Sequence, residues 1–202
     1  SGMGSCASCA TAHLILAENY PKKNFYPAPQ FLHNIIVSHG ASTNFNVIGK
    51  LLENNGICNY KNLPFIANEK LMPPKKAIDD AEKHRYFLKK VAKDSVKSAL
   101  DDGKLVAVAM EVFNQLQSDA SFFNSRYLNL PVSPYNIKKS QDHAVVIVGY
   151  NNKGWLVIDS GFSAVKYIMS FEYFEKYVYE AYTVERIKRN RKKRSNLGRR
   201  AK

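Results

Sequence analysis

The chain has 202 residues, of which 45% are hydrophobic, 12% aromatic and 23% charged, and its formal net charge is +13 at pH 7. This length and composition suit one globular domain, or two tightly joined lobes, with a sizeable core. No apolar run approaches the roughly 18 residues that a membrane span needs, so we expect no membrane association, and no signal peptide is visible.

The positive charge is concentrated at the C-terminal end. Residues 186–202 carry ten Lys or Arg and no acid, so residues 1–185 hold twenty bases against seventeen acids. We therefore expect a nearly neutral folded domain over 1–185 and a basic, disordered tail over 186–202. Such a tail is typical of a solvated end, of a nuclear-import signal read by an import receptor, and of an arm that contacts nucleic acid. The sequence leaves these three readings open.

The front half of the chain predicts helices. Residues 6–20 have almost no polar face, which is typical of a buried helix. Prolines at 21, 27 and 29 then break the chain, and residues 31–37 form a short apolar segment. Further helices are expected over 47–52 with a stop at Gly56, over 77–85, and over 94–100 with Asp94 as the cap.

The back half predicts strands. Apolar, β-branched runs cover 105–112, 143–150 and 154–159, and the last two are joined by an Asn-Asn-Lys-Gly hairpin turn. Two more strands are expected over 165–169 and 179–184, with a short helix or turn over 171–177. Helices followed by strands favour an α+β fold with two lobes and a cleft between them.

Two distant groups suggest sulfur chemistry. Cys6 follows Gly4-Ser5 at the start of the first helix, where the helix dipole stabilises a thiolate. His143 follows Asp142 at the start of a strand, which can hold an imidazole rigidly. Together they predict a thiolate–imidazolium pair, the requirement for nucleophilic catalysis by sulfur.

The three cysteines do not form a disulfide framework. A bridge from Cys58 to Cys6 or to Cys9 stays open at this stage. Cys6-Ala7-Ser8-Cys9 has the two-residue spacing of metal and redox sites. Only Cys58 remains for a second ligand pair, so we expect no zinc site.

The order and spacing of these residues resemble a known family. His143 lies 137 residues after Cys6, and Asp159 lies 153 residues after it, in the strand Trp155–Ser160. With Gly4-Ser5-Cys6 and the run Asp142 to Tyr150, this pattern is similar to that of the papain-like cysteine peptidases, from Gly4 to about Val184. The likeness is greatest to their compact bacterial and viral branches.

The resemblance implies a two-lobe α+β fold, with a helical N-terminal lobe that buries the nucleophile helix and an antiparallel, β-barrel-like C-terminal lobe. It implies that the Cys6 thiolate attacks a peptide carbonyl, that His143 carries the proton and that Asp159 orients His143. Ser42, Thr43 and Asp142 are the expected substrate-binding residues. No metal or cofactor is implied, the expected partner is a protein or peptide substrate, and the expected state is a monomer. An intracellular or virion-associated location is favoured over secretion, with a nuclear one suggested by the tail.

The chain departs from the family pattern at several positions. Asp159 replaces the customary Asn, and a carboxylate there favours the imidazolium. Gly161-Phe162 replaces the Trp-Gly that shields the histidine. The oxyanion-hole glutamine, six residues before the nucleophile, falls immediately before Ser1, so a chain that begins at Ser1 is expected to be weakened by ~10²–10³-fold.

Three alternatives remain at this stage. Sliding the motif by three residues makes Cys9 the nucleophile and puts Met3 at the glutamine position, but it leaves a shorter helix behind the sulfur, so Cys6 is favoured. A catalytically impaired papain-fold protein would act through its basic tail. An acyl transferase with transglutaminase-like chemistry would keep Cys-His-Asp and pass the acyl group to an amine.

Overall fold

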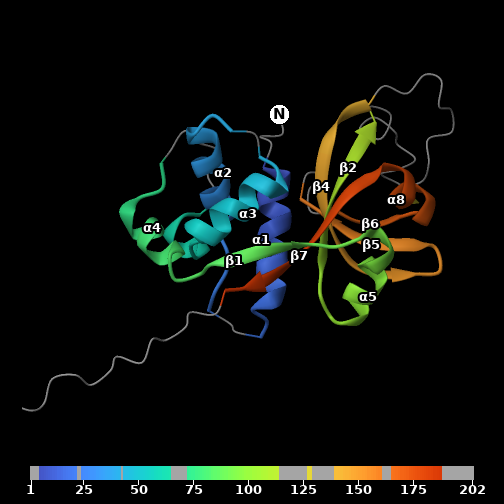
Figure 1. Cartoon of the computed structure of the whole chain (residues 1–202), viewed down its shortest axis with the longest axis horizontal. Helices are drawn as coiled ribbons and strands as arrows, with labels where there is room; N and C mark the ends of the chain where they lie inside the picture. Colours follow the sequence, from blue (N-terminus) through green and yellow to red (C-terminus); the bar gives the residue numbers. More distant parts are fainter. Residues whose placement is uncertain are drawn as a thin grey trace, which may run out of the picture.

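A computed structural model describes residues 5–21, 24–41, 43–64, 72–113, 127–128, 139–160 and 165–187. It confirms a mixed architecture of helices and a mainly antiparallel sheet. The helices within residues 6–81 gather on one side of Figure 1, and most of the sheet lies on the other side with the helices of residues 96–101 and 171–177. The helices are α1 (Cys6–Glu18), α2 (Pro29–Ser38), α3 (Phe45–Asn54), α4 (Lys75–Ala81), α5 (Val96–Asp101) and α8 (Phe171–Tyr177), with 3-10 turns at Tyr60–Asn62 and Lys93–Ser95. The strands are β1 (Tyr86–Lys90), β2 (Val106–Phe113), β3 (Tyr127–Leu128), β4 (Lys139–Asn151), β5 (Gly154–Asp159), β6 (Val165–Met169) and β7 (Val178–Arg186).

The sheet is open, so the expectation of a barrel-like lobe is wrong. Its strand order is β1-β7-β2-β4-β5-β6-β3, and every pairing is antiparallel except the short one between β3 and β6. Strand β1 extends away from β3 into the helical lobe, where it packs against α3 (Figure 1). The two ends of the sheet therefore have different neighbours and do not close on each other.

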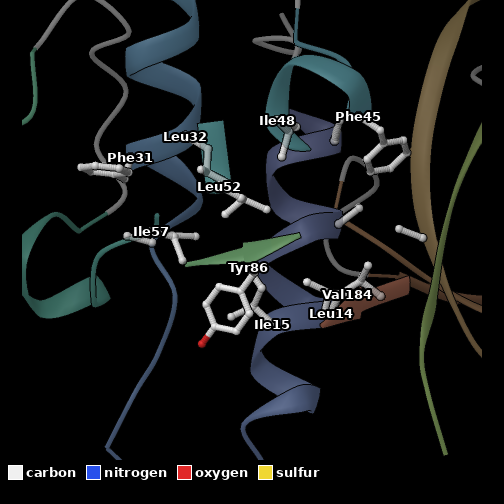
Figure 2. Close-up of a cluster of buried hydrophobic side chains, with 14 of the residues drawn as sticks. Leu14, Ile15, Phe31, Leu32, Phe45, Ile48, Leu52, Ile57, Tyr86 and Val184 are labelled. Atoms are coloured by element: carbon white, nitrogen blue, oxygen red, sulfur yellow. The ribbon is translucent and has the colours of Figure 1, made fainter. Parts of the chain in front are cut away.

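Two hydrophobic clusters flank the sheet. The first joins α1, α2 and α3 with β1 and includes Ile15, Phe31, Ile48 and Tyr86, all fully buried (Figure 2). The second lies on the other face of the sheet and brings α8 against it. Strand β4 separates the two clusters because alternate side chains of a strand point to opposite faces. Its members Ala144 and Val146 belong to the first cluster, and Val145 and Ile147 belong to the second.

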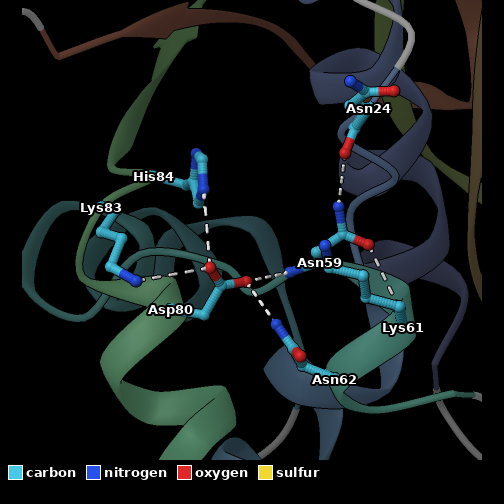
Figure 3. Close-up of polar contacts among 7 residues, drawn as sticks. All are labelled: Asn24, Asn59, Lys61, Asn62, Asp80, Lys83 and His84. Carbon is cyan, nitrogen blue, oxygen red and sulfur yellow. Dashed lines mark hydrogen bonds and ion pairs between the residues drawn. The ribbon is translucent and has the colours of Figure 1, made fainter.

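Asp80 of α4 holds together the segment that follows Cys58 (Figure 3). Its carboxylate accepts hydrogen bonds from the Asn59 backbone N–H at 2.9 Å and from the Asn62 side-chain amide at 2.8 Å. Burial opposes ionisation of Asp80, but these bonds and the nearby His84 and Lys83 lower its pKa. The carboxylate therefore stays charged and fixes this turn against α4.

Most of the helix and strand predictions are confirmed, with shifts at their ends. The segment 31–37 is the core of helix α2, which begins at Pro29. Strand β1 was not predicted: its burial pattern falls from a buried Tyr86 to exposed lysines, so it lacks a clear alternation. Asp94 lies in a 3-10 turn ahead of α5 rather than acting as its cap, because Ser95 is the N-cap residue.

Some predictions lie partly or wholly beyond what the structure describes. Strand β7 extends to Arg186, so this residue, counted above with the tail, ends a strand. The rest of the basic tail, from residue 188 onward, lies outside the described residues. Within the described ranges, no helix is both long and apolar enough to cross a membrane.

Gly56 ends the turn after α3 with φ of +79°, and a side chain there would have no space. A Cβ atom would overlap the carbonyl oxygens of Ala81 and His84. Gly103 has a similar φ of +76°, but a Cβ there would meet nothing within 4 Å. Gly103 therefore provides a matched control that has the same backbone strain without the clash.

We predict that Gly103→Ala lowers the free energy of unfolding by about 1–2 kcal/mol, the cost of left-handed backbone. Gly56→Ala should lower it by roughly 1–3 kcal/mol more, because it also overpacks the junction between α3 and α4. Urea unfolding of both variants and the parent chain measures the difference. Equal losses in the two variants would contradict the close packing around Gly56.

Candidate active site

The first turn of α1 presents Cys6 toward the sheet. Cys6 is the first residue of the helix, Ser5 is the N-cap residue, and the Cys6 side chain is half-buried. The backbone groups of Ala7, on the same helix, and Ala144, on β4, hydrogen-bond to its sulfur. The unpaired N–H groups of a helix start favour a negative charge at this position.

Strands β4 and β5 bring His143 and Asp159 together. Continuing the register from the pair Val146–Ile158 sets Asp159 opposite Val145, two residues from His143 and on the same face. The His143 Nε2 lies 2.8 Å from Asp159 Oδ1 and 3.0 Å from Oδ2. His143 is 8% exposed and Asp159 is fully buried. The imidazole is therefore held at Nε2, which leaves Nδ1 as the ring nitrogen able to serve Cys6.

The electrostatics of the three residues favour the charged pair. Burial opposes protonation of His143, but hydrogen bonds to Asp159 and Cys6, with the charges of both, raise its pKa to about 9. Burial also opposes ionisation of Cys6, but the hydrogen bond and positive charge of His143 lower its pKa below the usual value. Each group thus stabilises the charged form of the other.

Tyr167 of β6 is a member of this site that the sequence did not indicate. Its hydroxyl donates to Asp159 Oδ2 at 3.5 Å, and its side chain is 4% exposed. Burial and the neighbouring Asp159 carboxylate raise its pKa well above the usual value, so it remains a donor. The only sequence signal was its place in a predicted strand, because the pairing of β6 with β5 cannot be read from one strand alone.

Cys9 lies one helical turn after Cys6 and has different neighbours. Its sulfur hydrogen-bonds with Ser160 and Ser5, and burial raises its pKa. Of these two cysteines, Cys6 is thus the one that hydrogen-bonds with His143. Cys9 lines a cavity of about 320 Å³ that is otherwise bounded by Ala12, His13, Leu16, Tyr26, Pro27, Pro29, Tyr60 and Ser160.

The other predicted site residues are less well placed. Thr43 is half-buried just before α3, and Asp142 is exposed beside His143 on β4. Ser42 lies outside the described residues, as does the Gly161-Phe162 pair that replaces the family's shielding tryptophan. Among the residues that the structure describes, no group of three His, Cys, Asp or Glu is arranged to hold a metal ion.

Comparison with known proteins shows which solved structures have a similar fold. No family model matches the sequence, and no curated protein matches it at a significant level. Among solved structures, xylellain, a cysteine protease from Xylella fastidiosa, superposes with a TM-score of 0.76 at 20% identity, over 91% of this chain and 80% of that one.

Two plant proteases are also similar in structure. The bromelain protease from Ananas comosus, in complex with the E64 inhibitor, gives a TM-score of 0.61 at 13% identity, over 90% of this chain and 88% of that one. The Carica candamarcensis cysteine protease CMS1MS2, in complex with E-64, gives 0.57 at 14% identity, over 83% and 79%. The expected likeness to papain-like cysteine proteases is thus confirmed at the level of the fold.

Removing the Asp159 carboxylate should raise the pH at which Cys6 ionises. In Asp159→Asn, His143 loses the interaction that raises its pKa, so the imidazole takes the Cys6 proton less readily and the thiolate forms at higher pH. We predict that the midpoint of Cys6 alkylation by iodoacetamide rises by on the order of one pH unit. Peptide mass mapping across pH measures it.

Asp142→Asn is the matched control, because it removes an exposed carboxylate from the residue beside His143. It should leave the midpoint nearly unchanged, since solvent screens an exposed charge. An equal shift in both variants, or none in Asp159→Asn, would contradict a specific role of Asp159.

Proposed function

We propose that this chain, which has the fold of the papain-like cysteine proteases, is a cysteine endopeptidase. Cys6 is the nucleophile, His143 the acid–base group and Asp159 the residue that orients His143. The observation that supports this most directly is the continuous chain of contacts from the Cys6 sulfur through the imidazole to a fully buried carboxylate. A raised imidazole pKa beside a lowered thiol pKa is the condition under which sulfur attacks at neutral pH.

The reaction follows from this geometry. The Cys6 thiolate forms a bond to the carbonyl carbon of the scissile peptide, and the carbonyl oxygen takes the negative charge. N–H groups in the first turn of α1 have no acceptor within the helix and can donate to that oxygen. The His143 imidazolium gives its proton to the amine as the carbon–nitrogen bond breaks, which leaves a thioester on Cys6.

Hydrolysis returns the enzyme to its starting state. His143, now neutral, takes a proton from water as the oxygen attacks the thioester carbon. The carboxylic acid product leaves, and Cys6 and His143 recover their charges. Asp159 keeps the imidazole in one orientation throughout, and the Tyr167 hydroxyl holds the second carboxylate oxygen.

The proposed substrates are proteins or peptides. Thr43 and Asp142, together with Ser42, are the proposed contacts to the substrate backbone. We propose that the active form is a monomer, because both halves of the site come from one chain.

The Asp159 carboxylate also suits a second function. A Cys-His-Asp arrangement can transfer the acyl group from the thioester to a primary amine instead of water. The two functions share every step up to the thioester and differ in the second nucleophile. Product analysis with a primary amine present separates them, because transfer gives an amide and hydrolysis gives an acid.

Substitution of Cys6 should abolish activity. We predict that Cys6→Ala and His143→Ala each reduce kcat/KM on a fluorogenic peptide library by about 10⁴-fold or more, as loss of a nucleophile or its base does. Cys9→Ser should keep the parent activity. E-64, the inhibitor present in the two plant protease structures, should add once to the parent chain and to Cys9→Ser, and not to Cys6→Ala.

Peptide mapping of the adduct separates the alternatives. An adduct on Cys9, or loss of activity in Cys9→Ser alone, would make Cys9 the nucleophile. If circular dichroism shows that the parent chain is folded, yet this chain neither hydrolyses peptides nor reacts with E-64, the peptidase proposal is contradicted. That result would favour the impaired papain-fold protein.

A further inference from the structure

Cys9 is a thiol that the peptidase mechanism leaves unused. It lies three residues after Cys6 on α1, and both cysteines are free and half-buried. The turn that joins them is regular, because the Cys9 N–H donates to the Ser5 carbonyl at 2.9 Å. Residues three apart on a helix share one face, so the two side chains are neighbours.

The backbone geometry permits a bond between the two sulfurs. Three residues of α-helix rise about 4.5 Å and turn through about 300°, which sets the two Cα atoms about 5 Å apart. Disulfides in proteins join Cα atoms roughly 4.4–6.8 Å apart. The Cα separation is therefore within the disulfide range. The Cβ atoms of helical residues three apart lie about 5–6 Å apart, against roughly 3.5–4.5 Å in a disulfide, so a Cys6–Cys9 bond also requires the first turn of α1 to tighten locally.

The surroundings of the two sulfurs give them different reactivities. His143 and the helix start stabilise Cys6 as a thiolate, the form that reacts with peroxides. Cys9 remains a protonated thiol because burial raises its pKa, and Ser160 and Ser5 hold its sulfur in place. A reactive thiolate followed by a less reactive thiol after two residues is the arrangement of dithiol redox sites.

A reductant can reach the pair from solvent. Cys9 lines the cavity of about 320 Å³ beside α1, and two further lining residues, Tyr26 and Tyr60, are 57% and 43% exposed. Cys58, in contrast, is fully buried and does not lie on α1 with Cys6. The half-buried cysteine that neighbours Cys6 on the helix is thus Cys9 rather than Cys58.

We propose that Cys9 is a resolving cysteine, which converts a peroxide-oxidised Cys6 into a reversible Cys6–Cys9 disulfide. A hydroperoxide first transfers an oxygen atom to the Cys6 thiolate, which becomes a sulfenic acid while the peroxide is reduced to water or an alcohol. The Cys9 sulfur then attacks the Cys6 sulfur, and the sulfenic hydroxyl leaves as water with the Cys9 proton.

The disulfide switches off the proposed peptidase without destroying it. A dithiol reductant transfers two electrons and two protons to restore both cysteines. Without Cys9, the sulfenic acid is oxidised further to sulfinic and sulfonic acids, which dithiols do not reduce. The inference rests on the proposed function only in requiring a reactive Cys6 thiolate.

Peroxide treatment followed by maleimide blocking and trypsin digestion tests this proposal. Cys6 and Cys9 lie together in the tryptic peptide 1–22, and Cys58 lies in the peptide 51–61. In the parent chain, we expect peptide 1–22 to lose two hydrogens and to take up no maleimide. Peptidase activity should fall with peroxide and return with dithiothreitol.

Two variants make the result specific. Cys9→Ser should gain oxygen atoms on Cys6 and recover little activity with dithiothreitol, whereas Cys58→Ala should behave as the parent chain does. A cross-link between peptides 1–22 and 51–61, or equal recovery in the parent chain and Cys9→Ser, would overturn the proposal.

The mass readout separates this proposal from the peptidase proposal. If the untreated chain lacks both hydrolysis and E-64 labelling but still forms the Cys6–Cys9 bond, the peptidase proposal alone fails. If the untreated chain is active and peroxide oxidises Cys6 to the sulfonic acid in the parent chain, the resolving role of Cys9 alone fails.

Discussion

The close packing of helix α1 against strand β4 is the contact on which the site depends. Cys6 comes from the helical lobe, whereas His143 and Asp159 come from the sheet, so the packing of α1 against β4 brings them together. Small residues line it: Ala7 and Ala10 on the helix join the same buried cluster as Ala144 on the strand. Small side chains let the backbones approach closely, and the Ala144 backbone then reaches the Cys6 sulfur.

The same contact makes a buried charge tolerable. A carboxylate in the position of Asp159, with no exposed surface, is stable only when its oxygens are paired. His143 and Tyr167 supply these partners, and His143 in turn shares its charge with Cys6. Such a network is cooperative, so the protonation of each member depends on the positions of the others. Two hydrophobic clusters, one on each face of β4, hold those positions.

Local patterns in the sequence predicted the parts of this fold that local patterns determine. The apolar run of α1, the β4–β5 hairpin and the α+β class are confirmed, and the three candidate catalytic residues lie together in the structure. Strand β1, the open sheet and the bond from Tyr167 to Asp159 escaped prediction. Strand β1 was missed because its side chains do not alternate between buried and exposed. The open sheet and the Tyr167 bond depend on which strands pair across the chain, and the side-chain pattern of a single strand does not encode its partners.

The charge state of His143 is the most direct test of the proposed thiolate–imidazolium pair. NMR titration of the five histidine rings, with His143 assigned by a His143→Gln variant, measures it in the parent chain and in Cys6→Ala. The structure predicts that His143 titrates at about pH 9 in the parent chain and at lower pH in Cys6→Ala, where the thiolate is lost. Titration of His143 near its ordinary value of about 6.5 in both chains would contradict the pair.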